Sequence, residues 1–145
     1  MKATKFSRQR EAILKNMSER RDHPTADVIY QSLREEYPHL SLGTVYRNLN
    51  LLADLGKVRR IRTNESVEHF DYDTSDHCHF VCTTCGRVMD VPLMASDCFP
   101  DDTPFRDVGN VEFCSVLFYG TCLSCARAGK KSGARSADSP GKEST

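Results

Sequence analysis

Two pairs of cysteines constrain the fold of this chain more than any other feature. Cys82 and Cys85 form one C-x-x-C pair, and Cys122 and Cys125 form a second one after a gap of 36 residues. Four thiolates at such spacings are typical of a closed tetrahedral zinc site, which adds folding free energy to a small sheet. We therefore predict a structural Zn(II) bound by these four cysteines. Reduced free thiols and redox-active pairs are the alternatives.

The distribution of charge predicts two parts with different partners. The net charge is zero, yet residues 1–63 carry 13 Lys and Arg against 7 Asp and Glu, whereas residues 64–126 carry 2 against 11. A basic part followed by an acidic part favours a module that binds a polyanion joined to one that binds cations. Solvated faces that happen to cluster are the alternative.

The first part is predicted to form three short helices. Ser7, Thr25 and Ser41 are expected to cap them, because each precedes apolar residues at helical spacing. Pro38 is expected to end the second helix, and Gly56 the third. In the second helix the residues expected to face inward are Val28, Ile29 and Leu33.

A β-hairpin is predicted after the helices, since residues 58–62 and 67–72 flank a turn-like segment. Three helices and a hairpin are typical of a winged helix-turn-helix, in which the third helix recognises DNA. Its polar residues are expected on the exposed side, where Arg and Asn can bind bases and further arginines can bind phosphates. An ordinary solvated face is the alternative. The predicted DNA-binding residues are Thr44, Tyr46, Arg47, Asn50, Arg59, Arg60 and Arg8.

The second part lacks a helical period and is predicted to be a small sheet. Residues 80–81, 88–91 and 111–119 are the expected strands, and the prolines of segment 92–109 leave little room for a long helix. The tail is rich in Ser, Gly and Lys and is expected to be disordered. The predicted boundaries are 1–73 for the DNA-binding domain, 74–127 for the second domain and 128–145 for the tail.

Histidines and aspartates near the first cysteine pair suggest another metal site. His77 and His79 are two residues apart, so on a strand they share a face and can bind one ion. With Asp71 and Asp90 they offer a mixed imidazole and carboxylate shell, which suits Fe(II), Mn(II) or Zn(II). A surface histidine, or an aspartate that caps a turn, is the alternative for each one.

Taken together, several segments resemble the ferric uptake regulator (Fur) family over roughly residues 5–126. They are His23-Pro24-Thr25-Ala26-Asp27-Val28-Ile29-Tyr30, Ser41-Leu42-Gly43-Thr44-Val45-Tyr46-Arg47-Asn48-Leu49, Phe70-Asp71-Tyr72, Asp76-His77-Cys78-His79 and Cys82-x-x-Cys85-Gly86. Within the family the chain is most similar to the peroxide-sensing (PerR) branch. The resemblance implies an α+β fold, with an N-terminal winged helix-turn-helix domain followed by a small α/β dimerisation domain that carries the four-cysteine zinc site.

The resemblance also implies a function. A homodimer would bind a double-stranded DNA operator and repress transcription while a regulatory Fe(II) or Mn(II) is bound. Peroxide would then oxidise His23 or His77, release the metal and end repression. Asp71 favours the peroxide-sensing branch, because iron-sensing relatives typically carry Glu there. The implied regulatory ligands are His23, Asp71, His77, His79 and Asp90.

Two other functions stay open at this point. One is an iron-responsive or zinc-responsive member of the same family. The other is a zinc-dependent hydrolase that uses His77, His79 and Asp90, although the chain lacks the Glu of an H-E-x-x-H motif. We expect no enzyme activity, no small organic substrate and no membrane partner.

Two expectations remain, which concern the cellular compartment of the protein and the cysteines outside the quartet. No apolar run approaches the ~20 residues that span a bilayer, and the first residues lack the apolar core of a signal peptide, so we expect a cytoplasmic protein with reduced thiols. Cys78, Cys98 and Cys114 lie outside the quartet. We expect small buried apolar residues there, with a thiol-based sensor as the alternative.

Overall fold

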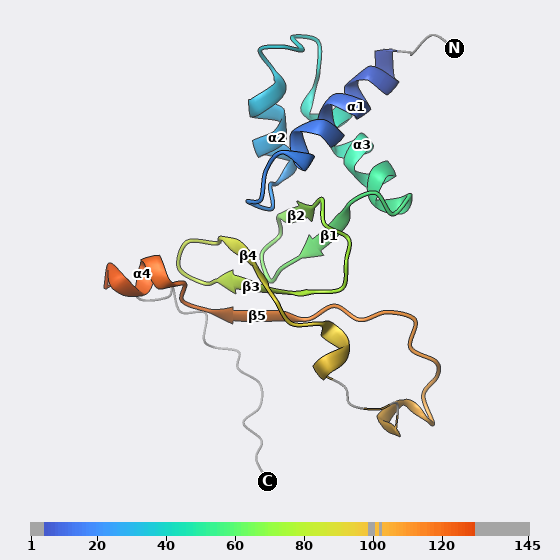
Figure 1. Ribbon diagram of the computed structural model, residues 1–145. Helices are drawn as coiled ribbons and strands as arrows, with labels where there is room; N and C mark the ends of the chain where they lie inside the picture. The colour runs from blue at the N-terminus through green and yellow to red at the C-terminus, as the bar shows by residue number, and fades with distance from the viewer. Residues whose placement is uncertain (1–4, 99–100, 102, 130–145) are drawn as a thin grey trace. The chain divides into compact units, whose positions relative to one another are not determined.

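A computed structural model describes residues 5–98, 101 and 103–129 (Figure 1). It divides the chain into two compact units, Met1–Ser75 and Asp76–Thr145, each of which is described by itself. The tail that was predicted to be disordered falls almost entirely outside the described residues, since only Ala128 and Gly129 of it are included. In the described part, no helix is both long and apolar enough to cross a membrane.

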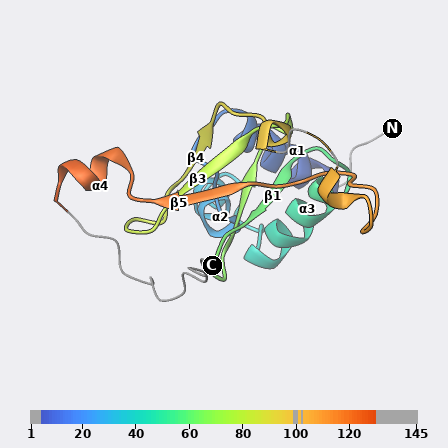
Figure 2. The same cartoon turned by 90° about the horizontal axis from the view of Figure 1, so that it is seen from below.

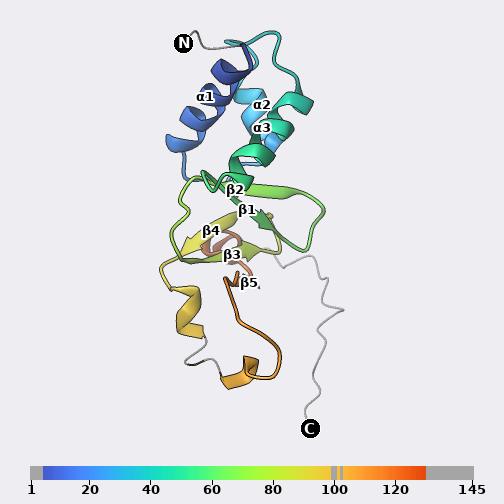
Figure 3. The same ribbon diagram turned by 90° about the vertical axis from the view of Figure 1, so that its right-hand side faces the viewer.

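Three helices form the core of the first unit: α1 (Lys5–Ser18), α2 (Ala26–Leu33) and α3 (Leu42–Asp54). They pack against one another around a largely apolar centre (Figure 3). Its largest buried side chains include Ile13, Met17, Ile29 and Leu49. Burial of such a centre is the main favourable contribution to folding of the unit.

Two of the three predicted helix caps are confirmed. Thr25 Oγ1 accepts a hydrogen bond from the Val28 amide at 3.3 Å, and Ser41 Oγ accepts one from the Thr44 amide at 3.1 Å. Each satisfies a backbone donor that has no partner within the first turn of its helix. Gly56 ends α3 as predicted, because its φ of 75° lies in the left-handed region.

Three details of the predicted helices are wrong. Helix α1 begins at Lys5, so Ser7 lies within the helix and is not its cap. Helix α2 ends at Leu33, five residues before Pro38. Val28 is 40% exposed, because Ala26 is the residue that shares the buried face with Ile29 and Leu33 at helical spacing.

The predicted hairpin is confirmed as strands β1 (Arg59–Arg62) and β2 (Glu68–Asp71), which pair antiparallel. Phe70 of β2 is fully buried in the helical core, and its amide donates to the Pro24 carbonyl at 2.9 Å. The hairpin is thereby fixed to the segment between α1 and α2. Three helices followed by this hairpin make a winged helix-turn-helix.

A three-stranded sheet forms the second unit, with strands β3 (Cys78–Cys82), β4 (Val88–Val91) and β5 (Leu117–Gly120) in the order β4-β3-β5. β4 pairs antiparallel with β3, and β5 pairs parallel with it (Figure 2). The strand expected over residues 111–119 begins only at Leu117, which pairs with His79 of β3.

Short helical elements complete the second unit. The segment after β4 holds two 3₁₀ turns, η1 (Ala95–Cys98) and η2 (Thr103–Phe105), and no longer helix in its described residues, as its prolines predicted. Helix α4 (Leu123–Arg127) follows β5 and is capped by Cys122. The second cysteine pair therefore lies at the beginning of a helix.

Candidate metal centres and DNA-binding surface

The four cysteines of the two C-x-x-C pairs meet at one end of the three-stranded sheet. Cys82 ends β3, and Cys122 and Cys125 lie at the beginning of α4. All four sulfur atoms lie within 4.8 Å of one another, and those of Cys85 and Cys122 are 4.0 Å apart. Zn–S bonds of ~2.3 Å place tetrahedral sulfurs about 3.8 Å apart, so the quartet fits a structural zinc ion.

Backbone amides favour the thiolate form of a cysteine in the quartet. The amides of Cys122 and Cys85 donate to the Cys82 sulfur at 3.3 and 3.5 Å. Burial raises the pKa of the Cys82 thiol, but donation from Cys122, Cys85 and Thr84 outweighs it and lowers this pKa to about 6. Burial raises the pKa of Cys125 to about 12, with the neighbouring thiols adding to the effect. The Cys82 sulfur thus ionises readily, and a bound cation would favour the thiolate form of its ligands.

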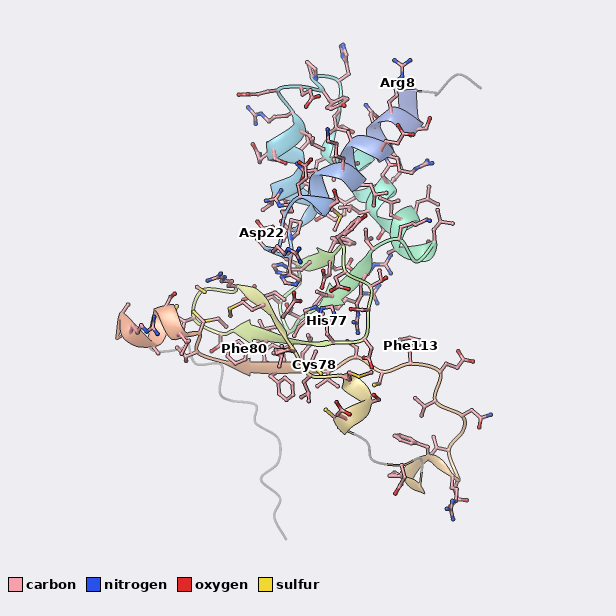
Figure 4. All side chains as sticks on the ribbon, in the orientation of Figure 1. Arg8, Asp22, His77, Cys78, Phe80 and Phe113 are labelled. Atoms are coloured by element: carbon pink, nitrogen blue, oxygen red, sulfur yellow. The ribbon has the colours of Figure 1, made fainter. Side chains whose placement is uncertain are left out.

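Two glycines permit the close packing of this end of the sheet. Gly86 has a φ of 78°, and its amide donates to the Cys82 carbonyl at 2.8 Å, which closes the turn of the first pair. A Cβ on Gly120 would lie 3.0 Å from the ring of Phe80. Phe80 in turn packs against the buried cysteines (Figure 4).

A second group of donors lies on β3 and β4. Register places His79 opposite Asp90, and His77 precedes β3 on the same side. The Nε2 atoms of His77 and His79 lie 2.8 and 3.4 Å from the same oxygen, Oδ1 of Asp90. Two buried imidazoles that converge on one carboxylate provide three donors of the kind that Fe(II), Mn(II) and Zn(II) accept.

The first unit holds a separate pair, His23 and Asp71, both buried, with 3.3 Å between Nε2 and Oδ2. His23 has a φ of 51°, in the left-handed region that L residues other than glycine rarely adopt. Its carbonyl accepts a hydrogen bond from the His69 ring at 2.8 Å, so Nδ1 of His69 carries the proton. Strand β2, which carries His69, thus supports an unfavourable backbone conformation of His23. In this conformation the His23 side chain faces Asp71.

His69 is a positioning residue that the sequence analysis missed. Its position beside Phe70 and Asp71 gave no indication of this role, because its partner is a backbone carbonyl 46 residues away. The five residues predicted as regulatory ligands therefore form two local groups. These are His23 with Asp71 in the first unit, and His77 with His79 and Asp90 in the second.

The predicted recognition helix exposes three of its four candidate residues. Tyr46, Arg47 and Asn50 are exposed, whereas Thr44 is only 8% exposed, so its predicted exposure is wrong. The buried stripe of α3 is wider than expected and includes Thr44 and Asn48. Thr44 instead accepts from Arg47 Nη2 at 3.1 Å, which orients the guanidinium from within the helix.

The arginines of the hairpin differ in their surroundings. Arg60 donates to Asn50 Oδ1 at 3.0 Å and pairs with Glu68 at 3.2 Å, so it links the hairpin to α3. Arg59 donates to the Ser75 carbonyl at 3.2 Å. Arg8 on α1 is exposed (Figure 4). Arg60 thus already has partners within the protein, on α3 and on β2.

Comparison with known proteins identifies the family. Residues 1–96 match the model of the ferric uptake regulator family. Peroxide-responsive repressors PerR of Staphylococcus saprophyticus and Staphylococcus aureus are 35% and 38% identical over 117 residues, which are 81% of this chain and 79% of theirs. The chain belongs to the ferric uptake regulator family.

Solved structures agree with this assignment. The Campylobacter jejuni peroxide stress regulator has a TM-score of 0.69 at 34% identity, with 83% of this chain and 91% of that one covered. The Helicobacter pylori ferric uptake regulator, at 19% identity, has a TM-score of 0.72 with 87% and 83% covered, and shows the shared fold. Family members are dimeric DNA-binding repressors, not enzymes, so the hydrolase alternative is wrong.

Proposed function

We propose that this protein is a metal-dependent repressor that leaves its DNA operator when hydrogen peroxide oxidises it. The observation that carries the proposal is the convergence of His77 and His79 on Asp90, which offers a cation site distinct from the cysteine quartet. The PerR proteins of two staphylococci, both named peroxide-responsive, support the choice of signal. We further propose that the protein acts in the cytoplasm.

We propose that His23 and Asp71 bind the same ion as His77, His79 and Asp90. His23 and Asp71 by themselves offer only two donors, whereas five imidazole and carboxylate donors from both groups suit Fe(II) or Mn(II). Because the two groups belong to different units, shared binding restricts the angle between the units. DNA affinity then depends on the metal through a coupling free energy of about 1–3 kcal/mol.

The side chains of the two groups determine how oxidation affects metal binding. Fe(II) held by these residues would supply the electron that cleaves the O–O bond of peroxide, whereas Mn(II) would react poorly. His23 and His77 are the imidazoles that we propose are modified. An oxygen added to the His77 ring perturbs the donor that lies 2.8 Å from Asp90. With one donor fewer the two groups release the ion, and the restriction on the angle between the units is lost.

We propose that α3 recognises the operator through Tyr46, Arg47 and Asn50, while Arg8 and Arg59 bind phosphates. Replacing Tyr46 and Arg47 together by Ala should abolish sequence-specific binding, since one bidentate Arg contact is worth about 1–3 kcal/mol. Arg34→Ala is the matched control, because Arg34 is an exposed arginine outside α3. Binding by the double variant at the level of Arg34→Ala would contradict the assignment of α3.

One experiment tests the proposed signal. The protein first selects a duplex from a random pool, and its affinity for that duplex is then measured with Fe(II), Mn(II) or Zn(II), before and after peroxide. We expect the Fe(II) form alone to lose affinity after peroxide. Mass spectrometry should find one added oxygen atom in peptides with His23 or His77, and none at His39, an exposed histidine outside both groups.

Unchanged DNA affinity of the Fe(II) form, with no oxygen added at either histidine, would sink the peroxide proposal. The iron-responsive or zinc-responsive alternative predicts that result, together with DNA binding that follows the concentration of Fe(II) or Zn(II). The same titration therefore distinguishes the two functions.

A further inference from the structure

Three cysteines outside the zinc quartet lie close together in the second unit. Cys78 begins β3, and its thiol lies near that of Cys98, at the end of η1. Cys114 is near enough to act electrostatically on the same thiol. The proposed repressor mechanism uses none of these three sulfur atoms.

Backbone hydrogen bonds hold the segments that carry these cysteines together. The Cys78 amide donates to the Leu93 carbonyl at 3.0 Å, and the Ala95 amide donates to Asp76 Oδ1 at 3.1 Å. Both bonds hold the single turn η1 against the beginning of β3, where Cys78 lies (Figure 4). The proximity of Cys78 and Cys98 is therefore built into the fold.

The two thiols differ in their access to solvent. Cys78 is completely buried, whereas Cys98 is exposed. A dissolved oxidant therefore reaches Cys98 first, and Cys78 is positioned to react with it afterwards. A redox-active pair commonly combines an accessible thiol with a neighbouring thiol that resolves it.

We propose that Cys78 and Cys98 form a reversible disulfide when hydrogen peroxide oxidises the protein. The Cys98 thiolate attacks one peroxide oxygen, the O–O bond breaks, and Cys98 becomes a sulfenic acid as the other oxygen leaves as water after protonation. The Cys78 sulfur then attacks the sulfenic sulfur, the S–O bond breaks, and a second water leaves. Two thiols have lost two electrons and two protons to one peroxide, and an added dithiol reverses the change.

The disulfide has a consequence that rests on the proposed function. Cys78 lies between His77 and His79 in the sequence, so a covalent bond to η1 alters the segment that carries both imidazoles. Disulfides require a narrow range of Cα separations and dihedral angles, and the beginning of β3 must adjust to meet them. We expect the affinity of His77, His79 and Asp90 for a divalent ion to fall upon oxidation.

The test uses the full-length protein with zinc bound and iron excluded, so that oxidation of histidine through iron does not contribute. After treatment with hydrogen peroxide, free thiols are alkylated and the chain is digested with trypsin without reduction. Trypsin places Cys98 alone on residues 88–106, Cys78 on residues 63–87 and Cys114 on residues 107–127. Fragmentation of a linked peptide distinguishes Cys78 from Cys82 and Cys85.

We expect residues 88–106 to be linked to residues 63–87 through Cys78, and released by dithiothreitol. Cys98→Ser should remove the link, and the matched control Cys114→Ser should keep it. Both substitutions avoid the buried Cys78 and so preserve folding, and retained zinc confirms an intact quartet. Recovery of residues 88–106 unlinked, or linked to Cys114, overturns the proposal.

The coupling is measured separately, by Mn(II) binding to the reduced, oxidised and re-reduced protein. We expect oxidation to weaken Mn(II) binding about tenfold or more and dithiothreitol to restore it, with no change in Cys98→Ser. A linked protein whose Mn(II) affinity is unchanged overturns the coupling. A reduced protein that binds no Mn(II) contradicts the proposed function instead. The thiol mapping then still tests the Cys78–Cys98 disulfide.

Discussion

At the scale of single residues, backbone groups position the metal-binding side chains. Two amides donate to the Cys82 sulfur, and the His69 ring supports the left-handed backbone of His23. The bond from His69 engages the His23 carbonyl and not the His23 ring. Replacing the His23 side chain should therefore change metal binding more than it changes the local backbone.

Replacing Cys125 by Ser should reduce bound zinc from about one ion per chain to nearly none, because a closed structural site uses all four thiolates. Elemental analysis of the purified protein measures the zinc. Cys114→Ser is the control, since that cysteine lies outside the quartet. Full zinc content in Cys125→Ser would show that the four cysteines do not form one site.

Replacing Asp90 by Asn should weaken Mn(II) binding by more than about tenfold, since the carboxylate that faces both His77 and His79 loses its charge. Electron paramagnetic resonance of unbound Mn(II) measures the affinity. Asp97→Asn is the matched control, as an exposed acid of the same unit. Equal affinities of the two variants would remove Asp90 from the ligand set.

At the scale of elements, the packing of β3 against β5 determines the geometry of the cysteine quartet. Parallel pairing places Cys82 opposite Gly120, two residues before Cys122, so the two C-x-x-C pairs meet. Phe80 covers Gly120 on the face where the buried cysteines cluster. The absence of a side chain at position 120 is thus part of the site.

Gly120→Ala should destabilise the second unit by about 1–3 kcal/mol, because the added methyl group overpacks the Phe80 ring. Gly43→Ala is the matched control. Its added Cβ meets nothing closer than 4.0 Å, and alanine in α3 should stabilise the first unit by about 0.5–1 kcal/mol. Urea unfolding of each variant measures the free energies. A neutral Gly120→Ala would mean that β5 shifts freely against β3.

At the scale of the whole molecule, charge and metal donors are divided between the units. The basic residues belong mainly to the unit with the winged helix-turn-helix, and the zinc quartet belongs to the other. His23 and Asp71 precede Ser75, whereas His77, His79 and Asp90 follow it. An ion shared by both groups is the means by which we propose that one unit responds to the other.

Mn(II) should change the small-angle X-ray scattering of the protein toward that of one rigid arrangement of the units, and His23→Ala should abolish this change. The variant loses the His23 imidazole but keeps the three proposed ligands of the second unit, which are His77, His79 and Asp90. His39→Ala is the control, because His39 is exposed and outside both groups. The same metal-dependent change in His23→Ala would contradict a shared ion.

Much of the fold could be predicted from local patterns. Thr25 and Ser41 cap their helices as expected, and Gly56 ends α3, because each acts through backbone groups a few residues away. The errors concern tertiary contacts. Val28 is exposed and Thr44 is buried, since the width of a buried helical stripe depends on what packs against it.

The sequence by itself determined the family, the two kinds of metal donors and the order of elements from α1 to β5, although not α4, because these depend on residue identity and short spacings. Only the tertiary structure decided which donors meet. The two cysteine pairs come together through parallel pairing of β3 with β5, across a gap of 36 residues that no local pattern specifies. The proximity of Cys78 and Cys98 likewise depends on hydrogen bonds between η1 and the beginning of β3.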